Sequence, residues 1–136
     1  MRRLYVVLIN VYMFLIGGFV YCLLEVVTRR RSHISMYLAG GLCFVVIGYV
    51  DERLGEKHGK IMKMFVSALI ITMVEFVIGL VVNVWLRLNV WDYKDMPFNI
   101  MGQICPVFTL LWFVVSYGAL GLNKVIRPVF IRNFNK

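Results

Sequence analysis

Residues 64–86 read MFVSALIITMVEFVIGLVVNVWL, a run of 23 residues in which Glu75 is the single charged side chain. The hydrocarbon core of a bilayer is about 30 Å thick, so a helix rising about 1.5 Å per residue needs about 20 apolar residues to cross it. Apolar and polar residues do not alternate with a period of two, which argues against a transmembrane β-strand. The stretch therefore predicts a transmembrane helix, and it decides the class of the chain.

Three further apolar runs surround this stretch. Residues 4–24 and 100–122 hold 21 and 23 residues without a formal charge, and residues 34–50 hold 17. The first run is too long for the apolar region of a signal peptide, and no small-x-small cleavage site follows it. The chain is 61% hydrophobic, whereas a soluble domain is about 45–50% apolar, and the mean hydropathy is +0.81.

These runs predict an all-α integral membrane four-helix bundle that forms a single transmembrane domain over residues 1–136. The expected helices cover residues 4–27, 34–52, 61–88 and 99–122. Residues 123–136 are expected to form an interfacial basic tail. Glycines occur within the predicted spans, and small residues let helix backbones approach closely in lipid. A bundle this narrow encloses little space of its own, so we expect a homo-oligomer, with a dimer favoured.

The distribution of Lys and Arg predicts the orientation. The N-terminus, the second connection and the tail together carry ten of the 15 cations, and the other two connections carry five. The positive-inside rule therefore predicts that both termini lie in the cytoplasm. The run Arg29–Arg31 argues the other way, and a dual topology is the alternative. The tail mixes apolar side chains with four cations, which favours a segment that lies on the anionic inner leaflet.

Several kinds of chemistry find no support in the sequence. The three cysteines fall inside predicted spans and the two histidines are isolated, so we expect no disulfide, no metal site and no cofactor. No Walker, HExxH or GxSxG motif is present, so we expect no catalytic residues and no enzyme activity. Any ATPase or further membrane subunit would be a separate chain, and no nucleic-acid partner is expected.

Glu75 is the strongest functional candidate, because it falls near the middle of its span. A charged side chain at that depth costs at least about 2.5–3.5 kcal/mol, and such residues usually mark a solute or proton path. No Lys or Arg lies at matching depth. We therefore expect Glu75 to be either protonated or hydrogen-bonded to polar side chains such as Tyr12, Tyr21, Gln103 or Tyr117. A purely structural link between helices is the alternative.

Two other features lie toward the outer ends of the spans. Glu25 precedes Arg29 by four residues, which predicts a salt bridge on one helix face, or a polar site shared with Glu75 and Gln103. Pro106 lies inside the fourth predicted span and should loosen that helix around Gly102–Pro106.

Asn99 is expected to cap the fourth helix, because its side chain can accept a hydrogen bond from an amide in the first turn. Trp85, Trp91 and Tyr93 fall where an interfacial aromatic belt is expected.

Residues 91–112 read WDYKDMPFNIMGQICPVFTLLW. The motifs W-D-Y, P-F-N and G-Q-I-C, followed by an apolar helix, resemble the signature of a bacterial family described as ABC-transporter type IV permeases. The family also has a Glu late in its first helix, another in the helix before W-D-Y and an Arg opening its second helix. Those places match Glu25, Glu75 and either Arg30 or Arg31. Gln103 stands where many members have Arg, and SHISMYLAGG replaces a Pro-rich motif in the second helix.

The resemblance implies a permease-like protein of the bacterial inner membrane that moves a small solute or ion, with Glu75 as the protonatable group. Gln103, Asn99 and the loosened Gly102–Pro106 turn are expected to line the outer half of the path, with Asp92 and Arg31 at its rim. A non-transporting scaffold, assembly or sensor subunit is one alternative. A holin-like pore former is another.

Overall fold

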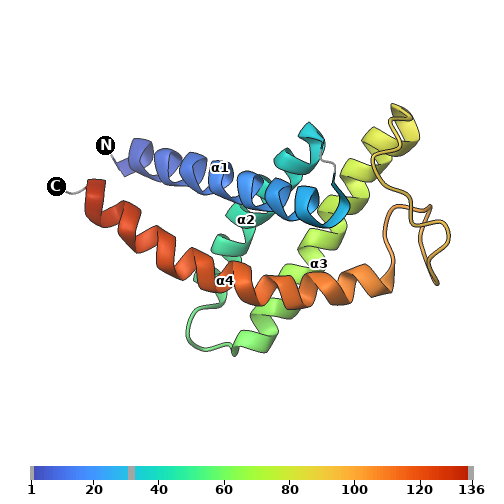
Figure 1. The fold of residues 1–136 in the computed structure, drawn as a ribbon. Helices are drawn as coiled ribbons and strands as arrows, with labels where there is room; N and C mark the ends of the chain where they lie inside the picture. The colour runs from blue at the N-terminus through green and yellow to red at the C-terminus, as the bar shows by residue number, and fades with distance from the viewer. Residues whose placement is uncertain (1, 31–32, 135–136) are drawn as a thin grey trace.

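The computed structural model describes residues 2–30 and 33–134, and its described residues form four long helices (Figure 1). They are α1 (Arg2–Arg29), α2 (Ile34–Leu54), α3 (Lys60–Gly79), which continues as the π-helical segment η1 (Leu80–Trp85), and α4 (Pro106–Phe134). By length and composition, each of the four spans can cross a membrane. The predicted all-α class is therefore confirmed, and the chain is a multi-pass membrane protein.

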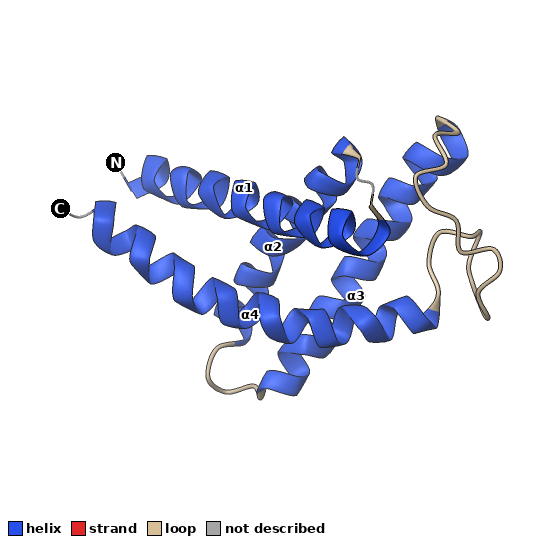
Figure 2. Cartoon of the chain, in the orientation of Figure 1, coloured by secondary structure: helices blue, strands red, loops and turns tan. Residues whose placement is uncertain are grey.

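The two ends of the chain lie at the same end of the fold, where α1 begins and α4 finishes (Figure 1). The connection at residues 86–105 lies at the opposite end, beside the end of η1 and the start of α4 (Figure 2). Four crossings return the chain to the side of the membrane on which it starts. The assignment of that side to the cytoplasm stays a prediction.

Glycines allow α1 and α2 to pack at short range. A Cβ atom built on Gly17 would overlap Cβ of Phe44, and one built on Gly40 would overlap Cβ of Tyr21. Lipid tails are as apolar as the helix surfaces, so close van der Waals packing of this kind is what holds helices together in a bilayer. The expected role of the span glycines is met at this helix pair.

Small and polar residues fill the contact between α3 and α4. Ser67 and Ser116 are fully buried, and the hydroxyl oxygens of Thr72 and Thr109 lie 3.0 Å apart. The apolar core beside them is formed by Cys43, Ile47, Ala68, Ile71, Trp112 and Leu120. This core connects α2, α3 and α4 into one bundle.

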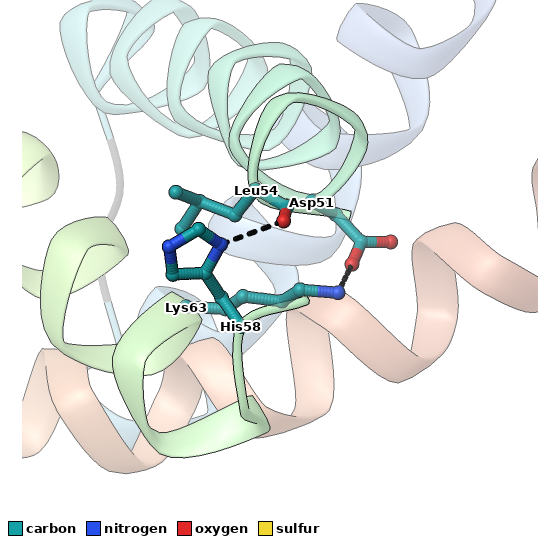
Figure 3. Close-up of polar contacts among 4 residues, drawn as sticks. All are labelled: Asp51, Leu54, His58 and Lys63. Carbon is teal, nitrogen blue, oxygen red and sulfur yellow. Dashed lines mark hydrogen bonds and ion pairs between the residues drawn. The ribbon is translucent and has the colours of Figure 1, made fainter. Parts of the chain in front are cut away.

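Two polar contacts close the connection between α2 and α3 (Figure 3). Nζ of Lys63 donates to Oδ1 of Asp51 at 2.6 Å, and Lys63 is buried. Nδ1 of His58 donates to the carbonyl oxygen of Leu54 at 2.8 Å. The ion pair fixes the end of α2 against the first turn of α3.

The fourth helix differs from its prediction at both ends. It begins at Pro106 instead of residue 99, and it continues through the expected interfacial tail to Phe134. A proline in the first turn needs no intrahelical hydrogen bond from its nitrogen, and its fixed φ favours a helix start. The predicted break inside the helix at Gly102–Pro106 is therefore wrong, because those residues precede the helix or open it.

Candidate intramembrane carboxylate site

Glu75 lies in α3 and is 8% exposed. Its Oε1 accepts a hydrogen bond from the hydroxyl of Tyr93 at 2.8 Å. Its Oε2 accepts from Nε1 of Trp112 at 3.0 Å. Tyr93 comes from the 86–105 connection and Trp112 from α4, so the carboxylate joins three parts of the chain within the bundle.

Tyr93 is held in place from two directions. Its ring stacks on Phe108 of α4, with centroids 4.4 Å apart and planes 11° from parallel. Its backbone nitrogen donates to the carbonyl oxygen of Gly102 at 2.8 Å. Gly102 has φ of 71°, a left-handed conformation that glycine adopts without strain. The hydroxyl is thus aimed at Glu75 by packing and by the fold of the connection.

A cavity of ≈ 450 Å³ adjoins the carboxylate. Residues from all four helices line it, and Trp91 of the connection forms part of its wall. Among these lining residues Glu75 carries the one carboxylate, and most of the others are apolar. They include Val20, Leu24, Met36, Ala39, Phe44, Ile47, Ile71, Val74, Val115, Ala119 and Leu122. The arrangement is a largely apolar chamber with a single acidic group in its wall.

Gln103 organises the connection above this chamber. Its Oε1 accepts from Nδ2 of Asn83 at 2.8 Å, and its backbone oxygen accepts from Nε1 of Trp91 at 3.1 Å. Oδ1 of Asn83 accepts in turn from the backbone nitrogen of Val90 at 2.7 Å. A Cβ atom on Gly79 would meet both Gln103 and Trp91, so the missing side chain at that position lets the connection lie directly on α3.

Asn99 does not cap α4, which corrects the prediction. Its Nδ2 donates to the carbonyl oxygens of Lys94 and Met96 at 3.0 and 2.8 Å, and its Oδ1 accepts from the nitrogen of Gly102 at 3.1 Å. These bonds close the turn around residues 94–102, which ends four residues before α4 begins. Neither Asn99 nor Gln103 is among the residues that line the chamber, so their role toward a solute stays a prediction.

Two other predicted site residues, Asp92 and Glu25, are not among the residues that line the chamber. Asp92 is exposed, and its Oδ1 accepts from the backbone nitrogen of Lys94 at 2.9 Å. Glu25 is half-buried near the end of α1. Arg31 and the side chain of Arg29 lie outside the described residues, so the predicted Glu25–Arg29 pair is not described.

The predicted aromatic belt is wrong for two of its three members and stays a prediction for Trp85. Trp85 is 76% exposed, as a residue at a membrane interface would be, but Trp91 and Tyr93 are 4% and 5% exposed. Both turn inward because their polar tips find acceptors there, on Gln103 and Glu75. Two side chains expected in the membrane interface instead build the site.

Comparison with known families agrees with this architecture. Residues 3–136 match the model of the family described as "Putative ABC-transporter type IV". The chain belongs to this family. The resemblance predicted from the sequence is therefore confirmed, and the ABC-transporter type IV description indicates a transporter-type membrane protein. Neither a curated protein nor a solved structure matches the chain.

In this ABC-transporter type IV protein, Tyr93 and Trp112 donate to Glu75, and neither was among the partners predicted from the sequence. Trp112 offers a signal in retrospect, since an indole N–H inside an apolar span needs an acceptor. Tyr93 offers none, because its distance from Glu75 depends on how the 86–105 connection folds. Of the partners that were named, Gln103 bonds Asn83, while Tyr12 stacks on Phe130.

Proposed function

We propose that this protein is a permease-like inner-membrane component that binds and moves a small organic solute through the chamber beside Glu75. The observation that supports it most is a cavity of ≈ 450 Å³ between four membrane-compatible helices, with one carboxylate in an apolar wall. Cavities of about 300–1,000 Å³ that are mostly apolar, with a few placed polar groups, are typical of small-molecule sites.

The chemistry of the wall favours a particular kind of solute. A carboxylate in a low-dielectric site attracts a cation or a hydrogen-bond donor more strongly than it would in water. A bare metal ion would need about six oxygen ligands, and Glu75 is the one carboxylate among the lining residues. We therefore favour a compact organic solute with an apolar body and one positive charge or donor group.

The proposal includes two partners. A second copy of the chain would complete the path that one narrow bundle encloses only in part, so a homodimer is favoured. The family description supports a separate ATPase chain as the energy source. The proposal involves no chemical conversion of the solute.

Reconstitution into liposomes tests the proposal. Tetraethylammonium is a suitable probe, because it carries a fixed charge, has an apolar surface and does not cross a bilayer unaided. Wild-type protein is expected to bind it and to raise its entry down a concentration gradient, which needs no ATPase, and Glu75→Gln is expected to abolish both. Glu52→Gln is the matched control, since Glu52 is exposed and does not line the chamber. Uptake that survives Glu75→Gln would remove Glu75 from the mechanism.

The two hydrogen bonds of Glu75 favour a second candidate, a non-transporting scaffold or sensor subunit. In that case Glu75 serves to tie the 86–105 connection and α4 to α3. Glu75→Gln would then lower the free energy of unfolding, while tetraethylammonium would neither bind to the wild-type protein nor enter the liposomes. Stable co-purification with another membrane chain would support this candidate further.

A further inference from the structure

A second cavity lies between the end of α2 and the later half of α4, and it shares no lining residue with the chamber beside Glu75. Its volume is ≈ 550 Å³, and we call it the basic cleft, after the three cations Lys124, Arg127 and Arg132 that line it. Asn123 and the backbone of Gly48 form its inner wall. Pro128 and Ile131 add an apolar side.

The charges around the basic cleft leave positive charge in excess. Asp51 lines the cleft, but Lys63 already neutralises it at 2.6 Å (Figure 3). Glu52 pairs with Nη1 of Arg127 at 3.3 Å, and its side chain is 64% exposed, so the pair is weak. Among the described residues, Lys124 and Arg132 make no ion pair.

Two buried donors at the basic cleft have no acceptor in the part of the chain that the structure describes. They are Nδ2 of Asn123, a residue that is 4% exposed, and Nε of Arg127. The Asn123 amide packs so tightly on Gly48 that a Cβ atom there would overlap it. Buried donors in folded proteins are nearly always paired, so two of them in one cleft indicate that an acceptor binds there.

The depth of the basic cleft matches the headgroup region of a bilayer. Arg127 follows Pro106 by 21 residues along α4, which places it about 32 Å along the helix. The hydrocarbon core of a bilayer is about 30 Å thick. The cations therefore reach the level at which phospholipid phosphates lie, on the side of the membrane that carries both termini.

We propose that the basic cleft binds the phosphate group of an anionic phospholipid. Lys124 and Arg132 supply charge, Arg127 and Asn123 supply the buried donors, and Pro128 and Ile131 contact the start of an acyl chain. Basic pockets between transmembrane helices recognise lipid headgroups in this way. The site is independent of the proposed function, since it shares no residue with the chamber beside Glu75.

Lipid retention by the full-length protein in detergent tests the proposal. Protein is incubated in mixed micelles of phosphatidylglycerol and phosphatidylcholine, and the bound lipids are counted by native mass spectrometry. Wild-type protein is expected to retain phosphatidylglycerol in preference. Lys124→Gln combined with Arg132→Gln should weaken that retention about 10- to 30-fold, from the effect of two cations near a headgroup. Both residues are exposed, so the fold should be unaffected.

The matched control is Arg53→Gln combined with Lys57→Gln, which removes two exposed cations outside the basic cleft on the same side of the membrane. Retention should be unchanged in this control. Equal losses from both pairs would overturn the proposal, because a diffuse surface charge would then explain the binding. Equal retention of phosphatidylglycerol and phosphatidylcholine would also overturn it. A third contrary result would be that millimolar inorganic phosphate binds in the basic cleft and displaces phosphatidylglycerol.

Arg127→Lys tests the buried donors separately from the charge. Lysine keeps the positive charge but lacks the Nε donor and the fixed fork of a guanidinium. Retention of phosphatidylglycerol is expected to fall several-fold. Wild-type retention in this variant would show that charge alone binds the lipid, and it would overturn the assigned geometry.

Discussion

Glu75 illustrates how hydrogen bonds from neutral side chains can accommodate a carboxylate in a membrane span. Moving a carboxylate to the centre of a span costs about 2.5–3.5 kcal/mol on insertion scales. A hydrogen bond to a charged group contributes about 1.5–3 kcal/mol. Donors from Tyr93 and Trp112 at 2.8 and 3.0 Å together offset that cost. The acid is therefore stable beside the chamber, where it remains close enough to act on a solute.

Tyr93→Phe tests this balance at the residue scale. The substitution removes the hydroxyl that bonds Glu75 but keeps the ring stacked on Phe108. The free energy of unfolding in detergent should fall by about 1.5–3 kcal/mol, because a buried carboxylate loses one of its donors. Tyr117→Phe is the control, since the Tyr117 ring is exposed and lies under Nζ of Lys60. If Tyr93→Phe and Tyr117→Phe have equal free energies of unfolding, the Tyr93–Glu75 hydrogen bond does not stabilise the bundle.

At this scale the sequence singles out Glu75 as a candidate but does not predict the side chains that surround it. Glu75 stands out because a carboxylate in an apolar run is rare whatever the fold. Its donors depend on tertiary structure, and Trp91 and Tyr93 show the difficulty. An aromatic with a polar tip suits a membrane interface and a buried hydrogen bond equally well. The local sequence cannot distinguish an aromatic at the membrane interface from one that is buried. The inward fold of the 86–105 connection decides that Trp91 and Tyr93 are buried.

At the scale of elements, the spans were predictable and the 86–105 connection was not. The thickness of the bilayer sets the length of a span, so a run of apolar residues places the first three helices within a few positions, whereas α4 is shifted toward the end of the chain. The connection contains four non-glycine residues with positive φ, namely Arg87, Asn89, Phe98 and Met101. Local preferences disfavour this conformation for three of them, all but Asn89. Such a path forms because the bonds of Gln103, Asn83 and Asn99 require it.

The packing of α1 on α2 leads to a prediction about two glycines. Gly40→Ala should lower the free energy of unfolding by about 1–2 kcal/mol, because overlap with Tyr21 costs about 1–3 kcal/mol and exceeds the gain in helix propensity. Gly121→Ala should instead be neutral or stabilising, by up to about 1 kcal/mol, since open space surrounds Gly121. Unfolding in detergent measures both. Changes of the same sign would contradict close packing at Gly40.

At the scale of the whole molecule, the surface is apolar where a soluble protein would be polar. Large exposed hydrophobic side chains occur on every span, among them Leu4, Phe19, Leu38, Met73, Leu110 and Val114. Contiguous apolar surface of this kind is stable only in contact with lipid or another chain. Charge gathers instead at the end of α2, at the start of α3 and in the later half of α4, where the basic cleft and the Asp51–Lys63 pair lie. The polar ends and the apolar middle together fix how the bundle sits across a bilayer.

The remaining question at this scale is which end faces the cytoplasm, and cysteine labelling answers it. The native cysteines Cys22, Cys43 and Cys105 lie in or beside the spans and can be replaced by alanine. In that background, Asp95→Cys in the 86–105 connection should react with a membrane-impermeant maleimide in intact spheroplasts. Lys57→Cys in the α2–α3 connection should react only after the membrane is opened, because ten of the 15 cations lie on its side. Partial labelling at both positions in intact cells would instead reveal a dual topology. In that case Arg29, Arg30 and Arg31 would balance the cations of the opposite face, and a dimer would contain chains of both orientations.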